Sequence, residues 1–162
     1  MAKDIQPGAP PLDRIDLRIL DVLQEDNQLT NLDLAARVGL SPPPCLRRVR
    51  RLRALGVIVR DVALVDPAKV GRAITAFVGV ELDRQREDVL ANFERKVLAE
   101  PEVQQCYFVS GEVDYLLVVT CADMPSYNAF ARRVLANEHN IKRFRTSFTL
   151  SRVKYETKLP LA

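Results

Sequence analysis

Residues 31–58, NLDLAARVGLSPPPCLRRVRRLRALGVI, decide the architecture of the first part of this chain. The stretch predicts two short helices joined by a tight turn at Gly39, because glycine adopts the left-handed conformation that ends a helix. Thr30 can cap the first helix, with Asp33 three residues later completing a capping box. Ser41 is expected to cap the second helix, and the three prolines after it fall in the first turn, where the missing amides would have had no intrahelical partner. This spacing is typical of a helix-turn-helix.

The second helix of this pair is expected to carry arginine on its outer side. At about 100° per residue, the apolar side chains point one way: Cys45, Val49 and Leu52. The arginines point the other way: Arg47, Arg50 and Arg51, with Arg48 at the edge. A solvated charged face is the alternative interpretation, but such faces usually mix both signs, and residues 41–60 contain no acid. Because the guanidinium fork binds guanine or clamps a phosphate, the pattern favours a recognition helix in the DNA major groove.

The bulk composition fits an intracellular protein. The chain has 162 residues and a net charge of +3, and the positive excess falls within residues 1–72. No apolar run approaches the ~18 residues that a membrane span requires, and the first residues lack the apolar core of a signal peptide. The three cysteines lack metal-ligand spacing and indicate reduced, structural thiols. We expect a cytoplasmic protein without a cofactor, a metal or a membrane contact.

Changes in periodicity divide the chain into successive parts. The first residues are rich in proline and glycine and predict a flexible arm. An amphipathic helix over residues 12–25 completes a three-helix domain. The β runs at 57–59 and 62–65 predict either a small wing or a strand that leaves the domain. The expected boundaries are an arm at 1–11, a helix-turn-helix domain at 12–65, a linker at 66–73 and a second domain at 74–162.

The second domain predicts an α+β fold. Strands are expected at 74–82, 103–109, 115–121 and 144–153, and helices at 87–99 and 124–136. The order β-α-β-β-α-β is that of a ferredoxin-like fold. Residues 115–121, YLLVVTC, are apolar at nearly every position, so both faces of that strand favour burial. We therefore expect two such sheets to pack face to face in a two-fold dimer, which also suits a protein that reads a pseudo-palindromic site.

Three motifs, occurring in order, carry a resemblance to a known family: LDRIDLRIL (12–20), RVGLSPPPCLRRVRRL (37–52) and VSGEVDYLL (109–117). Together they resemble the Lrp/AsnC family of transcriptional regulators, the leucine-responsive or feast/famine regulators. The resemblance implies a winged helix-turn-helix domain followed by a ferredoxin-like, RAM- or ACT-like domain for effector binding and oligomerisation. It also implies a bacterial, nucleoid-associated homodimer that assembles to an octamer, binds double-stranded DNA, and responds to an amino acid such as leucine.

The resemblance assigns site residues by position. The expected DNA-binding residues are Ser41, Pro42, Arg47, Arg48, Arg50 and Arg51. The expected effector-binding residues are Gly111, Asp114 and Tyr115 in one loop, with Met124, Ser147, Phe148 and Thr149 lining the pocket between neighbouring subunits. Two departures from the family, Pro43 in place of a hydroxyl residue and the basic Arg47, indicate that this helix reads its own operator.

The chemistry of the loop is compatible with an amino-acid ligand. Asp114 could accept hydrogen bonds from an ammonium group, and backbone amides around Gly111 could donate to a carboxylate. Glycine and aspartate are also ordinary hairpin residues, so a purely structural turn is the alternative.

Two other functions stand as alternatives for the whole chain. One is an amino-acid-sensing module that acts through protein partners. The other, an enzyme, is not expected, because His139 is the only histidine and no catalytic arrangement can be completed around it.

Overall fold

A computed structural model describes residues 11–161 of the chain. Residues 1–10, which make up nearly all of the expected N-terminal arm, and residue 162 lie outside the described residues. The chain forms two compact units. The first includes the residues up to Ala63 together with the segment that begins at Lys154, and the second runs from Leu64 to Val153. No helix of the described part is long and apolar enough to cross a membrane.

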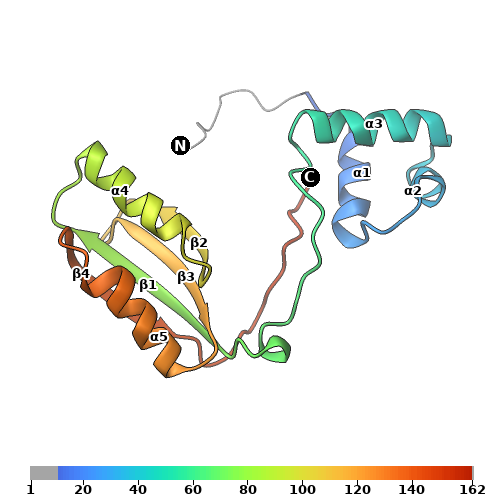
Figure 1. Cartoon of the computed structure of the whole chain (residues 1–162). Coiled ribbons are helices and arrows are strands. Elements are labelled where there is room, and N and C mark those ends of the chain that lie inside the picture. Colours follow the sequence, from blue (N-terminus) through green and yellow to red (C-terminus); the bar gives the residue numbers. More distant parts are fainter. Residues whose placement is uncertain (1–10, 162) are drawn as a thin grey trace. The chain divides into compact units, whose positions relative to one another are not determined.

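The first unit is built on three helices, α1 (Arg14–Glu25), α2 (Asn31–Val38) and α3 (Pro42–Ala54), labelled in Figure 1. Asp13 caps α1 and accepts hydrogen bonds from the amides of Ile15 and Asp16, in a complete capping box. Thr30 caps α2 by accepting from the Asp33 amide, and Gly39 ends α2 with φ of 74°. The three helices share one core made of Ile19, Leu20, Leu34, Ala35, Val38, Cys45 and Leu52.

Ser41 stands at the N-cap position of α3 but makes no side-chain capping hydrogen bond. The reason lies in the sequence that follows. A capping side chain accepts from the amides of the second and third helical residues, and prolines occupy those positions here. The expected cap is therefore present only as a backbone position, and the Ser41 hydroxyl is left outside the helix.

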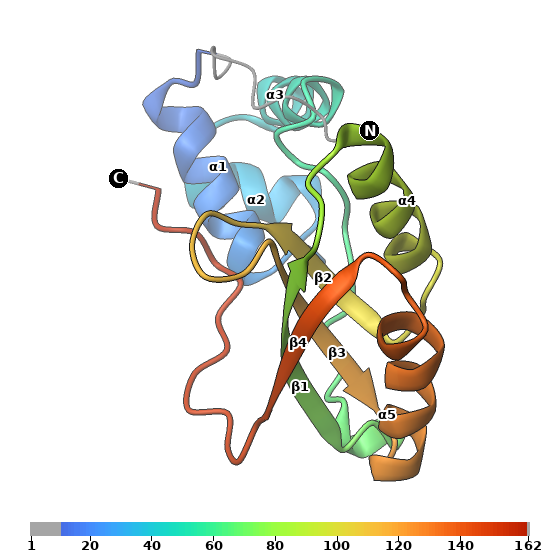
Figure 2. The same cartoon turned by 90° about the vertical axis from the view of Figure 1, so that its left-hand side faces the viewer.

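The C-terminal segment packs against α1 within the first unit, as Figure 2 shows. The Leu159 amide donates to Gln24 Oε1 at 2.7 Å, and Gln24 Nε2 donates to the Leu159 carbonyl at 3.1 Å. Lys158 Nζ lies 2.8 Å from Asp21 and 2.5 Å from Glu25. Leu161 packs against the helical core. These contacts explain why a segment that follows the second domain in sequence clusters with the helices in space.

The second unit is a four-stranded antiparallel sheet with two helices. Its elements are β1 (Ile74–Leu82), α4 (Glu87–Leu98), β2 (Val103–Phe108), β3 (Tyr115–Cys121), α5 (Met124–Phe130) and β4 (Ile141–Phe148). A short 3₁₀ helix, Ala68–Val70, precedes β1, and a π-helical segment, Ala131–Ala136, continues α5. The strand order is β2-β3-β1-β4, and α4 and α5 cover the same face in Figures 1 and 2. This arrangement confirms the α+β, ferredoxin-like fold expected from the sequence.

Two expectations about strands were wrong. The last strand was expected at residues 144–153 but runs from Ile141 to Phe148, because its pairing with β1 begins opposite Leu82 and the last paired residue is Phe148 opposite Ala76. Residues 57–65 were expected to form short β runs, yet they are in no helix or strand. A β run needs a neighbouring strand to accept its backbone hydrogen bonds, and none pairs with it in the described chain.

The two faces of the sheet differ in burial. The side chains of β1 and β3 that face the helices are buried, among them Val78 and Leu117, both with no exposure. On the opposite face, Phe77 is 50% exposed, Tyr107 52% and Leu116 42%. This second side of the sheet, which carries Phe77 and Leu116 on its central strands and Tyr107 on the edge strand β2, is called the open face.

Candidate nucleic-acid interface and effector-binding site

The outer surface of α3 presents two unpaired arginines. Arg47 and Arg50 are both exposed, and neither forms an ion pair within residues 11–161. They are three residues apart on a helix, so their side chains are neighbours on one face. The opposite side of α3 carries Cys45 and Leu52, which are fully buried in the helical core. The expected division of this helix into an arginine face and an apolar face is present in the structure.

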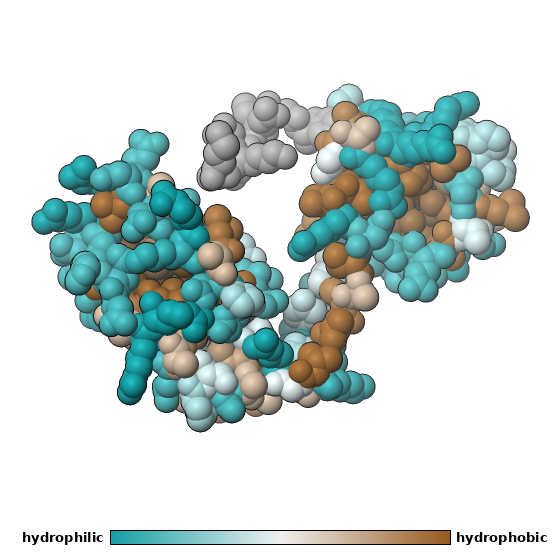
Figure 3. Space-filling view, in the orientation of Figure 1, coloured by the Kyte–Doolittle hydropathy of each residue, from teal (hydrophilic) through white to brown (hydrophobic). Residues whose placement is uncertain are grey.

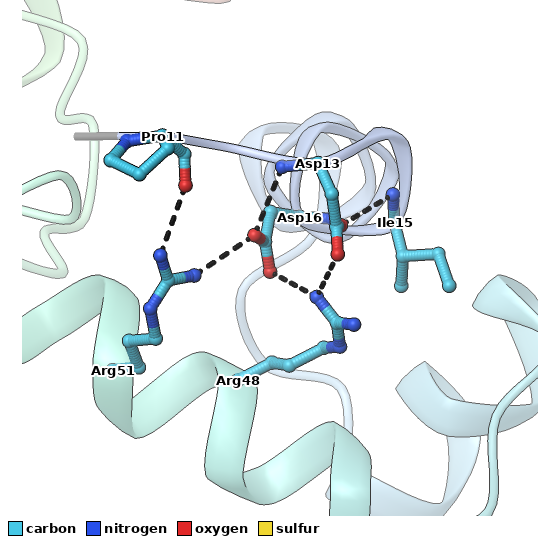
Figure 4. A network of polar contacts seen from close by, with 6 residues as sticks. All are labelled: Pro11, Asp13, Ile15, Asp16, Arg48 and Arg51. Atoms are coloured by element: carbon cyan, nitrogen blue, oxygen red, sulfur yellow. Dashed lines mark hydrogen bonds and ion pairs between the residues drawn. The ribbon is translucent and has the colours of Figure 1, made fainter. Parts of the chain in front are cut away.

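Arg48 and Arg51 are held by carboxylates of α1 and its cap (Figure 4). Arg48 Nη1 lies 2.7 Å from Asp13 Oδ2 and 2.8 Å from Asp16 Oδ1. Arg51 Nη1 lies 3.0 Å from Asp16 Oδ2, and Arg51 Nη2 donates to the Pro11 carbonyl at 2.9 Å. The sequence predicts both arginines at DNA and gives Asp13 and Asp16 no place in the site. The only available signal was the capping box that brings these two acids together at the start of α1.

The Asp13 carboxyl is set up to remain ionised. The backbone amide of Asp16 and then the Arg48 guanidinium hold the pKa of Asp13 below its ordinary value. Asp16 is buried, with 1% of its side chain exposed, and its two carboxylate oxygens face different arginines.

A hollow on this surface is lined by Asp13, Asp16, Arg47, Arg48 and Arg51, together with Pro11, Leu40 and Pro44. Acidic and basic groups are thus mixed at this edge of α3, and a fifth arginine of the helix, Arg53, pairs with Asp61 at 2.5 Å.

The start of α3 offers hydroxyl and side-chain donors but few amides. Helix N-termini usually bind phosphate through free backbone N–H groups, and Pro42, Pro43 and Pro44 have none. The first amide after them, at Cys45, donates to the Ser41 carbonyl at 3.3 Å. Asn31 Nδ2 donates to the Pro42 carbonyl at 2.8 Å and ties α2 to α3. A phosphate at this end would therefore be bound by the exposed Ser41 hydroxyl and by arginine.

The loop residues of the expected effector site have different environments. Gly111 is exposed with φ of 143°, a conformation that favours glycine. Asp114 is buried, and its oxygens accept from the Leu82 amide at 2.7 Å and from Gln85 Nε2 at 2.5 Å. Tyr115 is 1% exposed. Both Asp114 and Tyr115 therefore use their polar groups inside the unit.

Tyr115 lies on the helix side of the sheet. Its hydroxyl donates to Glu94 of α4 at 2.8 Å. Its ring packs against Phe93 and Phe108, with centroids 4.8 and 5.1 Å away. Burial, and then the Glu94 hydrogen bond, raise the pKa of the Tyr115 phenol. The side chain fills the core, and only its backbone lies next to the loop.

The remaining expected effector residues lie near the start of α5 and the end of β4. Met124 begins α5 and is 42% exposed, and Ser147 and Thr149 are exposed as well. The Phe148 ring meets Tyr127 of α5 edge-on, with centroids 4.9 Å apart. The Thr149 amide donates to the Thr75 carbonyl at 2.9 Å. These four residues lie at the end of the sheet where β1 begins, with Ser147 opposite Phe77 of the open face and Phe148 opposite the buried Ala76.

The strand register separates the two groups of expected effector residues. Tyr115 pairs with Val80 near the end of β1, whereas Phe148 pairs with Ala76 and Thr149 bonds to Thr75 near its start. At about 3.3 Å per residue, the spacing along β1 is ~13–17 Å. A single amino acid is too small to contact both groups within one unit. A site that includes both groups would need two copies of the chain.

Comparison with known proteins identifies both halves of the chain. The family model described as the Lrp/AsnC ligand binding domain matches residues 75–159, and the model of a winged helix-turn-helix DNA-binding domain matches residues 12–59. The leucine-responsive regulatory protein of Escherichia coli is 39% identical over 154 residues, covering 95% of this chain and 93% of that protein. An HTH-type transcriptional regulator of Sinorhizobium fredii is 43% identical over 157 residues, covering 97% and 93%.

Solved structures resemble the chain along nearly its whole length. A transcriptional regulator of Neisseria meningitidis, solved as a complex with L-methionine, has a TM-score of 0.88 and 39% identity, covering 93% of this chain and 97% of that one. An AsnC family regulator of Agrobacterium tumefaciens has a TM-score of 0.87 and 43% identity, with the same coverage. Sequence and structure therefore point to the same group of proteins.

Proposed function

Because the chain belongs to the Lrp/AsnC family of transcriptional regulators, whose members bind DNA and are not enzymes, we propose that α3 reads an operator and that an amino acid modulates this binding. The observation that carries the first part is that Arg47 and Arg50 are exposed on an acid-free helix and form no ion pair with any residue that the structure describes. A helix that docks in a protein groove usually presents an apolar stripe instead.

The DNA contacts are placed on the outer face of α3. Arg47 and Arg50 bind base edges or phosphates, and Ser41 with Pro42 approaches the backbone at the start of the helix. Arg48 and Arg51 reach the same surface, but carboxylates already bind their guanidinium groups. Prolines remove the amides at the start of α3, so side chains supply nearly all of the donors. Arginine contacts should therefore dominate the affinity.

Two copies of the chain are proposed to pack through their open faces. Phe77, Tyr107 and Leu116 supply exposed apolar area on that face, and burying it would stabilise a two-fold dimer. A dimer presents two α3 helices to successive half-sites on one side of DNA. Octamers are the further assembly proposed from the family. As part of the same proposal, the protein acts in the cytoplasm, in association with the nucleoid.

The effector is proposed to be an apolar amino acid, such as leucine or methionine, bound between neighbouring subunits. The Neisseria relative that was solved with L-methionine supports this class of ligand. The loop around Gly111 supplies backbone amides, and Met124, Ser147, Phe148 and Thr149 of another copy supply the second wall. Asp114 and Tyr115 shape this loop from within, because their polar groups already have partners in the unit.

The DNA-binding proposal predicts a specific change in salt dependence. Arg50→Ala should weaken binding to duplex DNA and reduce the slope of log K against log salt by about 0.9 for each phosphate that the variant no longer neutralises. Fluorescence anisotropy with a labelled duplex of mixed sequence measures both quantities. Arg84→Ala is the matched control, since Arg84 is an exposed arginine of the second unit. Equal slopes for the parent, the Arg50 variant and the control would contradict the proposal.

The effector proposal predicts stabilisation by one or a few amino acids. A ligand at 100 times its dissociation constant should stabilise the native state by about 2.7 kcal/mol. A thermal-shift screen of the twenty L-amino acids measures this effect, with the D-enantiomer of each hit as the control for a non-specific solute effect. If no L-amino acid raised the melting temperature above its D-enantiomer, the amino-acid effector would be excluded.

A further inference from the structure

Asp16 is a buried acid that lies between α1 and the recognition helix. Its side chain is 1% exposed, and its oxygens are divided between Arg48 at 2.8 Å and Arg51 at 3.0 Å. Asp16 Oδ2 also accepts from the Asp13 amide at 3.2 Å, and Asp13 gives Arg48 a second carboxylate at 2.7 Å. Figure 4 shows both guanidinium groups turned toward these two acids. The whole cluster lies at the surface where the proposed function places DNA.

Stability alone is a weak explanation for this cluster. Taking a carboxylate out of water carries a desolvation cost that ion pairing often only balances, so buried ion pairs are more convincingly explained by what they position. The hydrophobic core of Ile19, Leu52 and their neighbours already joins α1 to α3. The carboxylates add something that an apolar contact cannot add. They fix the direction of two arginines that would otherwise be mobile and positively charged at a DNA-binding surface.

We propose that Asp16, assisted by Asp13, divides four of the five arginines of α3 into two sets and thereby determines DNA specificity; the fifth, Arg53, pairs with Asp61. Arg48 and Arg51 are positioning residues that hold α3 against α1. Arg47 and Arg50 are the arginines that remain free for DNA. This inference rests on the proposed DNA-binding function and assigns its residues.

The physical reason concerns phosphates. A free guanidinium binds any phosphate, whatever the base sequence, so each additional free arginine raises non-specific affinity. The side chains of Arg48 and Arg51 are 29% and 43% exposed, close enough to the surface to reach DNA if released. Asp16 and Asp13 occupy these guanidinium groups in place of phosphate. Because Arg48 and Arg51 then make no contacts with phosphate, the ratio of specific to non-specific DNA affinity is higher.

The variant Asp16→Asn tests directly whether Asp16 keeps the guanidinium groups of Arg48 and Arg51 from binding phosphate. The variant keeps the size of the side chain but removes the carboxylate that binds Arg51 and one of the two carboxylates that bind Arg48. We expect tighter binding to a duplex of mixed sequence, a salt slope steeper by about 0.9–1.8, and a smaller affinity ratio between a duplex selected with the parent protein and the mixed duplex. Asp33→Asn is the matched control. It removes one acid of the same unit, and the described hydrogen bonds of Asp33 are with Thr30 and not with an arginine of α3. A slope and an affinity ratio equal to those of the control would overturn the proposal.

A second pair of variants keeps the test decisive if Asp16→Asn does not fold. Arg48→Met should lower affinity for the selected duplex, because α3 is held less firmly against α1, but should leave the salt slope on the mixed duplex at the parent value. Arg50→Met should reduce that slope by about 0.9. If Arg48→Met reduced the slope as much as Arg50→Met, Arg48 would bind phosphate itself and the proposal would be wrong. A parent protein without salt-dependent binding would instead refute the proposed function itself.

Discussion

Asp114 and Tyr115 are adjacent residues, and both direct their polar groups into the second unit. Tyr115 lies on the buried face of β3, and its hydroxyl donates a hydrogen bond to Glu94. The Asp114 carboxylate accepts a hydrogen bond from the amide of Leu82, the last residue of β1. The sequence indicated a loop at this position and the resemblance indicated an effector. Neither could show which side chains were already occupied, because the partners Leu82, Gln85 and Glu94 are 20 or more positions away along the chain. The same limit applies to Arg48 and Asp16, whose sequence separation is 32.

Asp114 gives a prediction at the scale of one residue. Asp114→Ala leaves the buried Leu82 amide without its acceptor, which should lower the free energy of unfolding by about 1–3 kcal/mol. The altered loop should also reduce the thermal shift produced by the effector, with DNA binding retained. Urea denaturation and the thermal-shift assay measure the two effects. Asp114→Asn is the control, because its amide oxygen can still accept from Leu82. An alanine variant that responded to the effector like the parent protein would separate Asp114 from the site.

At the scale of elements, local signals in the sequence predicted the helices better than the last strand. Caps at Thr30 and Gly39 lie where the pattern placed them, because a cap depends on residues within one helical turn. The strand expected at 115–121 coincides with β3, which is central in the sheet and apolar on both faces. The last strand was predicted too far toward the C-terminus, since β4 is an edge strand whose ends are set by pairing with β1. Pairing between distant segments is not encoded in the local pattern.

The N-terminal end of α3 also shows how an element depends on its local sequence. The sequence correctly indicated a helix start at Ser41 but wrongly gave its side chain a capping role. Pattern recognition identifies the residue type at a cap, whereas the hydrogen bond depends on an amide at the second or third helical position. Three consecutive prolines remove those amides. The hydroxyl that would have capped the helix is exposed where the proposed operator backbone lies.

At the scale of the whole molecule, several apolar surfaces remain uncovered in one chain. The open face carries Phe77 and Leu116 at its centre. The segment leaving α3 is also largely apolar and exposed, with Val59 84% and Leu64 63% exposed, and hydrophobic residues are brown in Figure 3. Monomeric proteins rarely expose continuous apolar patches of this kind. The proposed dimer would cover the first surface.

The dimer gives a prediction at the same scale. Phe77→Glu places a charge at the centre of the open face, so its burial in a sheet-to-sheet contact would carry a large desolvation cost. We expect the variant to be monomeric and to bind DNA more weakly, as measured by light scattering after size exclusion and by anisotropy. Leu98→Glu is the control, since Leu98 is 80% exposed at the end of α4 and away from the open face. Dimers of unchanged mass in the Phe77 variant would place the contact elsewhere.

The docking of the C-terminal segment on α1 has a consequence for the order of folding during synthesis. Domains generally fold as they emerge from the ribosome, beginning with the N-terminal one. Here α1 emerges first, but Lys158, Leu159 and Leu161, which contact α1 and its core, are made only after the entire sheet unit. The helical unit can acquire its three helices early, and its last contacts form only after the effector-binding unit has been translated. The DNA-binding half of the regulator therefore begins to fold before the sheet unit and is completed after it.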